Sequence, residues 1–260
     1  MTNFCSKMFG KFASYPFPQP LQKWINQGYV KIFGIDLGEF KPAQDYPTLN
    51  HLFTRELQKE RFVDMQEDVW VSPTDSLVMA RGKVEHNLAI QIKGMSYGVS
   101  EFLGEVVEDG YCYLNLYLSP KDYHRYHAPC DMEVVEVRYF GGELLPVNQK
   151  SLFKNHNLFI RNERVVVVAK DQRGRKFFYV AVGALNVGQM LLHFEPRLQT
   201  NARANECITY AYQEPVKIKK GREMGMFKMG STVVLIASGV NFELEEGRSV
   251  KFGERIGSFV

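Results

Sequence analysis

The sequence predicts an α+β protein that is mainly β, with a helical N-terminal segment followed by one antiparallel or mixed β-sheet domain. Two observations support this class. Before residue 60 apolar residues recur at helical spacing, whereas from Val69 onward short apolar runs alternate with turns. We therefore expect a helical segment over residues 1–60 and a β domain over residues 61–260.

Length and composition narrow the function classes. A chain of 260 residues can bury a sizeable core in one large domain or two small ones, and a net charge of +3 does not suggest nucleic-acid binding. No stretch reaches the roughly 18 apolar residues that span a bilayer, and the N-terminus has no apolar run typical of a signal peptide. The scattered cysteines, without a Cys-x-x-Cys pair, indicate reduced thiols on the cytoplasmic side: Cys5, Cys112, Cys130 and Cys207.

Residues 1–35 combine lysines and aromatic side chains and contain no acidic residue. Pro20 suits the first turn of a helix, and one face of that helix is apolar: Leu21, Trp24, Ile25, Tyr29 and Ile32. The helix could pack on its own core, but the cationic, aromatic composition favours a membrane-facing helix on an anionic surface. The four lysines at about 1 kcal/mol each give roughly 4 kcal/mol, or about a thousandfold enrichment, so attachment would be peripheral and reversible.

The remaining elements follow from local patterns. A second short helix after Pro47 would carry an apolar stripe of Leu49, Leu52, Phe53 and Leu57. Further along, the patterns predict one helix, at Val99 to Leu103, and strands at Tyr113 to Leu118, around Val135, Val137 and Tyr139, at Arg164 to Ala169, at Phe177 to Val182 and at Thr232 to Ile236. Asp171 to Gly174 reads as a hairpin turn between two of these strands.

The densest group of reactive side chains is the histidine block, residues 119–130, which directly follows a predicted strand and contains His124 and His127. A metal site built from Asp122, His124, His127 and Cys130 is one interpretation, although this spacing is not a known zinc pattern. Histidines satisfied by backbone groups in a loop are another. A third is general base catalysis, since neutral imidazole is the commonest base near pH 7. Asp75, in a Pro-initiated turn, could orient such a base or simply cap its own turn.

Ser231 follows Gly230 at the mouth of a predicted buried strand. The absent side chain of Gly230 allows a close approach to its carbonyl carbon, so the serine hydroxyl could attack the peptide bond on its own amino side. A nucleophile of this kind needs a base and an orienting acid nearby. The Gly-Ser-Thr sequence alone is an ordinary turn.

Taken together, these motifs resemble the phosphatidylserine decarboxylase proenzymes, which make their own pyruvoyl cofactor. The resemblance extends over most of the chain: Thr48 to Arg55, Ser72 to Asp75, Tyr117 to His127, Pro146 to Asn148, Asn162 to Val165, Val182 to Ala184, Val187 to Gly188, and Glu223 to Thr232. Ser76 stands where the family commonly has glycine, and Met229 where leucine is frequent. Residues 193–205 match weakly, which leaves the substrate-facing loops undefined.

The resemblance implies that Asp75, His127 and Ser231 form a triad that cleaves the chain between Gly230 and Ser231. The products would be a β chain of residues 1–230 and an α chain of residues 231–260. Ser231 would become the pyruvoyl group and take up the substrate amine as a Schiff base, with its carbonyl accepting electron density as CO₂ leaves. His124 would serve the decarboxylation step.

The function implied is decarboxylation of phosphatidylserine to phosphatidylethanolamine at the cytoplasmic face of the cell membrane, within phospholipid biosynthesis. The implied partners are phosphatidylserine in an anionic membrane and the two chains of one precursor. A homodimer is allowed, and neither nucleic acid nor metal is expected. Two rivals stay open: a pyruvoyl decarboxylase acting on a soluble amino acid, and a non-enzymatic membrane adapter. A serine hydrolase is disfavoured because Gly-x-Ser-x-Gly is absent.

Overall fold

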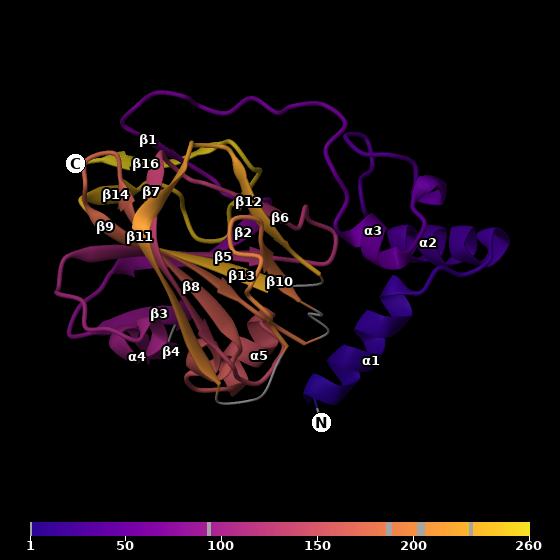
Figure 1. Ribbon diagram of the computed structural model, residues 1–260, viewed down its shortest axis with the longest axis horizontal. Helices are drawn as coiled ribbons and strands as arrows, with labels where there is room; N and C mark the ends of the chain where they lie inside the picture. Colours follow the sequence, from indigo (N-terminus) through magenta and orange to yellow (C-terminus); the bar gives the residue numbers. More distant parts are fainter. Residues whose placement is uncertain (1, 93–94, 186–188, 202–205, 229–230) are drawn as a thin grey trace.

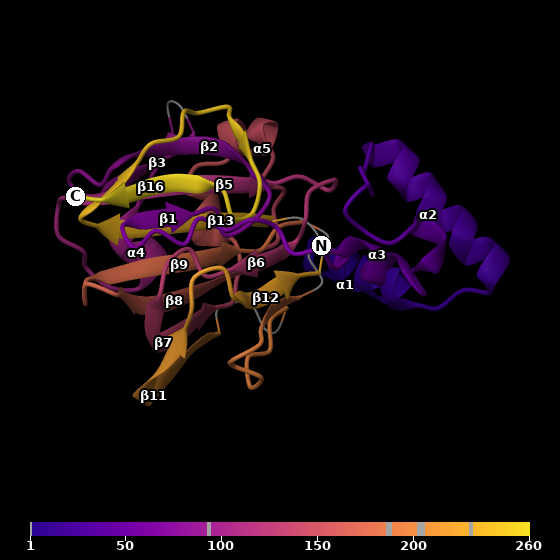
Figure 2. The same ribbon diagram turned by 90° about the horizontal axis from the view of Figure 1, so that it is seen from above.

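The computed structural model describes residues 2–92, 95–185, 189–201, 206–228 and 231–260. Figures 1 and 2 show a helical lobe beside a larger β body, joined to it by a long loop. Every ladder between the described strands is antiparallel. The predicted class, mainly β with N-terminal helices, is confirmed.

The N-terminal lobe contains α1 (Thr2–Ser14), α2 (Gln19–Phe33), a 3₁₀ turn η1 (Ala43–Asp45) and α3 (Leu49–Phe53). Helix α1 is not among the predicted elements, because lysines and a glycine interrupt its apolar residues. Helix α3 ends at Phe53, so Leu57 lies outside the predicted stripe. The lobe has a small apolar core of its own: Ala13, Tyr46, Leu49, Leu52 and Phe53. The domain boundary at residue 60 stays a prediction.

Helix α2 buries polar side chains and exposes apolar ones. Gln22 and Asn26 are buried, and the Asn26 amide donates to the carbonyls of Ala43 and Tyr46. On the outer side the Trp24 side chain is 74% exposed and Ile32 is 78% exposed. The polar pair anchors the helix to η1. Of the predicted apolar face, Ile25 and Tyr29 pack against the core of the lobe, whereas Leu21, Trp24 and Ile32 are exposed. None of the described helices combines the length and apolar character that crossing a bilayer requires.

The β body is built on an eight-stranded sheet. Its strands in spatial order are β11 (Cys207–Ile218), β7 (Met132–Phe140), β8 (Arg164–Asp171), β9 (Lys176–Val182), β13 (Ser231–Ser238), β5 (Tyr111–Leu118), β2 (Ser76–Lys83) and β15 (Ser249–Val250). The five predicted strands are β5, β7, β8, β9 and β13. The central strands are buried along almost their whole length, as expected for strands covered on both faces.

Shorter elements complete the body. One small sheet joins β1 (Val69–Val71), β16 (Arg255–Phe259) and β14 (Val240–Phe242), a second joins β10 (Met190–Leu192), β12 (Glu223–Phe227) and β6 (Arg125–His127), and β3 (Leu88–Ile92) pairs with β4 (Met95–Gly98). The helices of the body are α4 (Val99–Leu103), α5 (Gln149–Lys154) and α6 (Leu158–Arg161). Helix α4 has the predicted bounds.

Two local predictions have different outcomes. The turn between β8 and β9 forms as expected: Gly174 has a φ of 75°, and the Asp171 carboxylate accepts from the amides of Arg173 and Arg175. The predicted alternation of Val135 with Val137 in β7 is wrong. A β-bulge between residues 134 and 136 puts Val134, not Val135, in the buried set with Val137.

Candidate active site

The motifs singled out in the sequence meet at one end of the eight-stranded sheet. Thr232 of β13 pairs with Tyr117 of β5, and Tyr117 pairs with Leu77 of β2. These three residues form one row across the sheet. Ser231 begins β13, Asp75 precedes β2 and the histidine block follows β5, so all three lie at the same end.

Ser231 is held by a strand with neighbours on both edges, β5 and β9. Its side chain is 0% exposed, and its hydroxyl oxygen has no hydrogen-bond partner among the described residues. A buried hydroxyl without a partner costs about 1–3 kcal/mol. The strand thus holds an uncommitted hydroxyl in a dry, rigid setting, as a nucleophile requires. Gly230, Met229 and the Val187-Gly188 pair lie outside the described residues.

His127 ends β6, and its backbone amide donates to the Pro73 carbonyl at 2.9 Å. Its Nδ1 lies 2.9 Å from the Gly221 carbonyl oxygen, which can only accept, so Nδ1 carries the proton in this arrangement. Its Nε2 then presents a lone pair, which accepts from the Tyr123 hydroxyl at 3.0 Å. The ring stacks on Phe252 with centroids 3.6 Å apart.

The surroundings of His127 keep it neutral. Burial lowers the pKa of His127 to about 4, while the hydrogen bond to the Gly221 carbonyl opposes this shift more weakly. The imidazole is therefore unprotonated at pH 7 and can take a proton at Nε2 once the tyrosine hydroxyl yields its place.

The contacts of Asp75 are with Arg61 and Phe252. Its carboxylate accepts from Arg61 at 2.5 and 3.1 Å and from the Phe252 amide at 2.8 Å. No hydrogen bond joins Asp75 to His127 among the described residues, and Gly221 orients the imidazole instead. The two side chains are linked through Phe252, whose amide contacts the carboxylate and whose ring contacts the imidazole. The Asp75, His127 and Ser231 triad stays a prediction.

Arg61 is a site residue that sequence reasoning missed. Besides Asp75, it binds both carboxylate oxygens of Glu39 at 2.8 Å, and this bond is the main cause that lowers the pKa of Glu39 to about 2. Arg61 thereby ties the N-terminal lobe to the turn that carries Asp75. Its partners lie 14 and 22 residues away in sequence, so no local pattern could have identified the contact.

His124 is fully buried against the N-terminal lobe. Its Nδ1 lies 2.8 Å from the Asp122 carbonyl, its ring centroid is 3.9 Å from that of Phe53, and its Nε2 has no partner among the described residues. Burial is the main cause that lowers the pKa of His124 to about 3, and the nearby charge of Arg55 lowers it further. The imidazole is neutral, with a free Nε2.

The two histidines lie at opposite ends of the ladder between β6 and β12. His127 pairs with Glu223 at the start of β12, whereas the His124 carbonyl accepts from the Phe227 amide at its end.

A hollow of roughly 730 Å³ opens beside His127. Its lining includes Tyr123, Phe252 and an ionic group in which Glu223 accepts from Arg125 at 2.9 Å and contacts His193 at 2.7 Å. The hollow gives water or a small polar group access to the imidazole edge. Tyr123 and Phe252 are further site residues that composition and spacing did not reveal.

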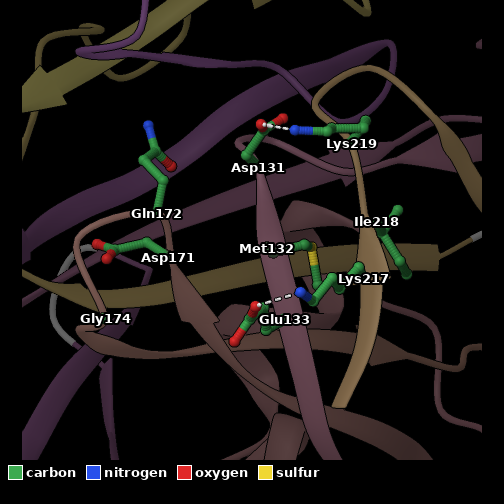
Figure 3. A pocket seen from close by; sticks show the side chains of 9 residues that line it. All are labelled: Asp131, Met132, Glu133, Asp171, Gln172, Gly174, Lys217, Ile218 and Lys219. Carbon is green, nitrogen blue, oxygen red and sulfur yellow. Dashed lines mark hydrogen bonds and ion pairs between the residues drawn. The ribbon is translucent and has the colours of Figure 1, made fainter. Parts of the chain in front are cut away.

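A second hollow, of roughly 370 Å³, is lined by residues of β7, of β11 and of the turn between β8 and β9 (Figure 3). Its charged rim is paired within itself: Lys219 binds Asp131 at 2.7 Å, and Lys217 lies 3.6 Å from Glu133. Paired charges of this kind offer little to a charged ligand.

The metal interpretation of the histidine block finds no support in the geometry. Both histidines turn their Nδ1 atoms to backbone carbonyls, and the Asp122 carboxylate accepts from the Ser119 amide and hydroxyl at 2.7 Å. Within the described ranges no group of three or more potential ligands gathers around one point.

Comparison with known proteins adds an independent finding. Residues 49–258 match the family model described as phosphatidylserine decarboxylase. The phosphatidylserine decarboxylase proenzyme of Helicobacter pylori is 51% identical over 100% of this chain and 98% of its own length. That of Campylobacter jejuni is 43% identical over 96% of this chain and 97% of its own, and the mitochondrial proenzyme of Rattus norvegicus is 30% identical over 99% and 72%.

Proposed function

The chain belongs to the phosphatidylserine decarboxylase family, and from this premise we propose that it cleaves itself between Gly230 and Ser231 and then converts phosphatidylserine to phosphatidylethanolamine and CO₂ at a membrane surface. The observation that carries the proposal is the buried, unpartnered hydroxyl of Ser231 at the head of a central strand. The family resemblance implies that this residue becomes the pyruvoyl group.

Self-cleavage needs a base and a fixed nucleophile. His127, neutral at pH 7, removes the proton from the Ser231 hydroxyl as the oxygen attacks the Gly230 carbonyl carbon. The C–N bond breaks, the amine takes a proton and an ester replaces the amide. Elimination then releases the Gly230 carboxylate and leaves dehydroalanine, and hydrolysis with loss of ammonia leaves the ketone. Base catalysis supplies about 10²–10⁴ of the acceleration, and the fixed strand supplies proximity.

The role of Asp75 in this step requires a rearrangement or an indirect route. In the rearrangement, the His127 Nδ1 would leave the Gly221 carbonyl oxygen and bind the Asp75 carboxylate instead. The indirect route already exists, because the Asp75 carboxylate fixes the Phe252 amide and the Phe252 ring fixes the imidazole plane. Asp75 is then a positioning residue for the base.

When formed, the pyruvoyl group supplies a ketone that takes up the substrate amine and a neighbouring carbonyl that accepts the electron pair as CO₂ leaves. The surroundings of Ser231 fit this use, since the strand is rigid and dry. His124 has a buried Nε2 without a partner among the described residues. Because the imidazole is neutral, this atom can accept a hydrogen bond or a proton from the substrate in the decarboxylation step.

The N-terminal lobe gives the proposed membrane face. Its exposed apolar side chains are Met8, Phe12, Tyr15, Leu21, Trp24, Ile32 and Phe33. Lysines 11, 23 and 31 are exposed on the same two helices. Apolar rings with flanking lysines suit the interface of an anionic bilayer, where a two-tailed lipid substrate resides. We place this face on the cytoplasmic leaflet, as a peripheral contact.

The proposal is tested by the intact masses of the purified wild-type protein and of Ser231→Ala. Wild type should give a large fragment ending at Gly230 and a small fragment that begins with a ketone and reacts with hydrazide. Ser231→Ala should stay one polypeptide, whereas His124→Ala should mature but turn over poorly. An active wild-type protein that is unbroken and free of a ketone contradicts the proposal. Turnover of soluble amino acids but not of liposomal phosphatidylserine supports the rival decarboxylase.

A further inference from the structure

Arg55 carries a buried guanidinium that lies over the Phe40 ring, 4.6 Å from its centroid, and that has few hydrogen-bond partners among the described residues. The residue follows α3 and is 2% exposed. Its Nη2 donates to the carbonyls of Lys121 at 2.5 Å and Asp122 at 2.9 Å. Its Nε and Nη1 are buried and have no hydrogen-bond partner among the described residues, and no carboxylate within the described ranges forms an ion pair with it. A buried charge with free donors is costly unless something binds them.

Arg164 shows how this chain satisfies an arginine whose role is structural. It is 5% exposed and also has no carboxylate partner among the described residues. Its three nitrogen atoms donate to the carbonyls of Phe102 at 2.8 Å, Ile160 at 2.6 Å and Glu101 at 3.0 Å. The fold can thus bury an arginine with each of its nitrogens bonded. The two nitrogens of Arg55 that lack partners are therefore available to an anionic ligand.

The surroundings of Arg55 favour an anion. Arg55 lines a cleft of roughly 160 Å³ together with Lys41 and Arg125. Of the two acidic residues on this cleft, Asp45 and Glu56, the second is engaged by Arg125 at 2.8 Å. The cleft therefore keeps an excess of positive charge.

The position of Arg55 connects it to the reaction. The Arg55 Nη2 and the His124 Nδ1 both donate to the Asp122 carbonyl oxygen, at 2.9 and 2.8 Å. The guanidinium and the imidazole are thus held side by side, where the N-terminal lobe meets the β body. We propose that Arg55 binds the phosphodiester of the lipid headgroup through its free Nε and Nη1 donors while His124 faces the reacting carbons. This inference rests on the proposed decarboxylation.

Two oxyanions on phosphatidylserine could meet this cation, the carboxylate and the phosphodiester, and the chemistry favours the second. Negative charge leaves the carboxylate as CO₂ forms, so a cation bound there would stabilise the substrate more than the transition state and slow the reaction. The phosphodiester keeps its charge throughout. Phosphate oxygens also accept charge-assisted hydrogen bonds from a guanidinium.

The test uses the mature enzyme with dihexanoyl phosphatidylserine as a dispersed substrate and dihexanoyl phosphatidylethanolamine as a competitive inhibitor. The variants are Arg55→Lys and Arg55→Met, with Arg164→Lys as the matched buried-arginine control. Self-cleavage on a denaturing gel reports folding of each variant. If the Met variant does not mature, the Lys variant still answers the question, because it keeps the charge but loses the Nε and Nη1 donors.

We expect both Arg55 variants to raise the KM for the substrate and the inhibition constant of the product by a similar factor of about 10 to 100, whereas the control changes neither. The product retains the phosphodiester and has lost the carboxylate. A rise in KM with an unchanged inhibition constant would assign Arg55 to the carboxylate and overturn the proposal. No change in either constant would overturn it altogether. A wild-type enzyme without turnover would instead refute the decarboxylation on which the inference rests.

Discussion

The buried setting of His127 makes a sharp prediction about the pH dependence of self-cleavage. An ordinary histidine with a pKa near 6.5 is about 9% neutral at pH 5.5. Burial lowers the pKa of His127 to about 4. At that pKa about 97% of the imidazole remains neutral at pH 5.5. Because the neutral form is the base, cleavage should keep nearly its full rate from pH 8 down to pH 5.5 and fall only as the pH approaches 4.

The assay starts from full-length chain made in a short cell-free synthesis and diluted into buffers from pH 4 to pH 8. Loss of the 260-residue band on a denaturing gel gives the cleavage rate. Ser231→Ala should stay intact at every pH, and His127→Ala should slow cleavage by about 10²–10⁴ at all of them. A rate that halves near pH 6.5 and drops about tenfold by pH 5.5 would refute the argument from burial, since the base would then titrate like an exposed imidazole.

Three further outcomes follow from the structure. Arg61→Met should lower the free energy of unfolding by about 2–4 kcal/mol, because the half-buried carboxylate of Asp75 loses the arginine that binds both of its oxygens. Urea unfolding of the variant in the Ser231→Ala background measures this change. The double variant Trp24→Ser with Ile32→Ser should lower the affinity for anionic vesicles, measured by co-sedimentation, at least about tenfold, and should leave self-cleavage unchanged. Gly225→Ala should abolish maturation, because its Cβ would collide with the Leu191 carbonyl oxygen and separate β10 from β12.

Matched controls make these outcomes specific. Arg61→Lys should recover part of the lost stability, since it keeps one charged donor. Val106→Ser removes an apolar side chain that is 83% exposed on the β body and should leave vesicle binding unchanged. Gly28→Ala places its Cβ in open space on α2 and should be tolerated. Equal loss of vesicle binding in the Val106 variant would argue against a dedicated membrane face, and normal maturation of the Gly225 variant would argue against the tight packing.

Local chemistry was sufficient to predict the central strands and the hairpin turn. The valine run of β8 and the apolar run of β13 have no polar interruption, so only a buried strand accommodates them. The bulge in β7 was not predictable, because Val134 and Val135 are equally apolar and only pairing with β8 decides which one turns inward. Helix α1 was missed for a related reason: its lysines break the apolar run but not the helix.

The sequence motifs indicated which residues to expect at the site but not which groups those residues contact. The motifs named His124, His127 and Ser231, and the structure brings them to one end of one sheet. The contacts that decide their chemistry come from distant parts of the chain: Gly221 on the imidazole, Arg61 on Asp75. Contacts over 94 and 14 residues are set by the order of the strands, which no local pattern encodes.

The strand order also explains how the chain can be cut at Ser231 without losing its site. The proposed small fragment, residues 231–260, contains β13 to β16. β13 lies between β5 and β9, and its ladder with β5 runs from Ser231 to Ser238. In addition, β15 pairs with β2 and β16 pairs with β1. Every strand used for these pairings belongs to the large fragment. The proposed cleavage would therefore break one backbone bond at the head of a central strand, free residue 231 to change chemically, and leave these ladders unaltered.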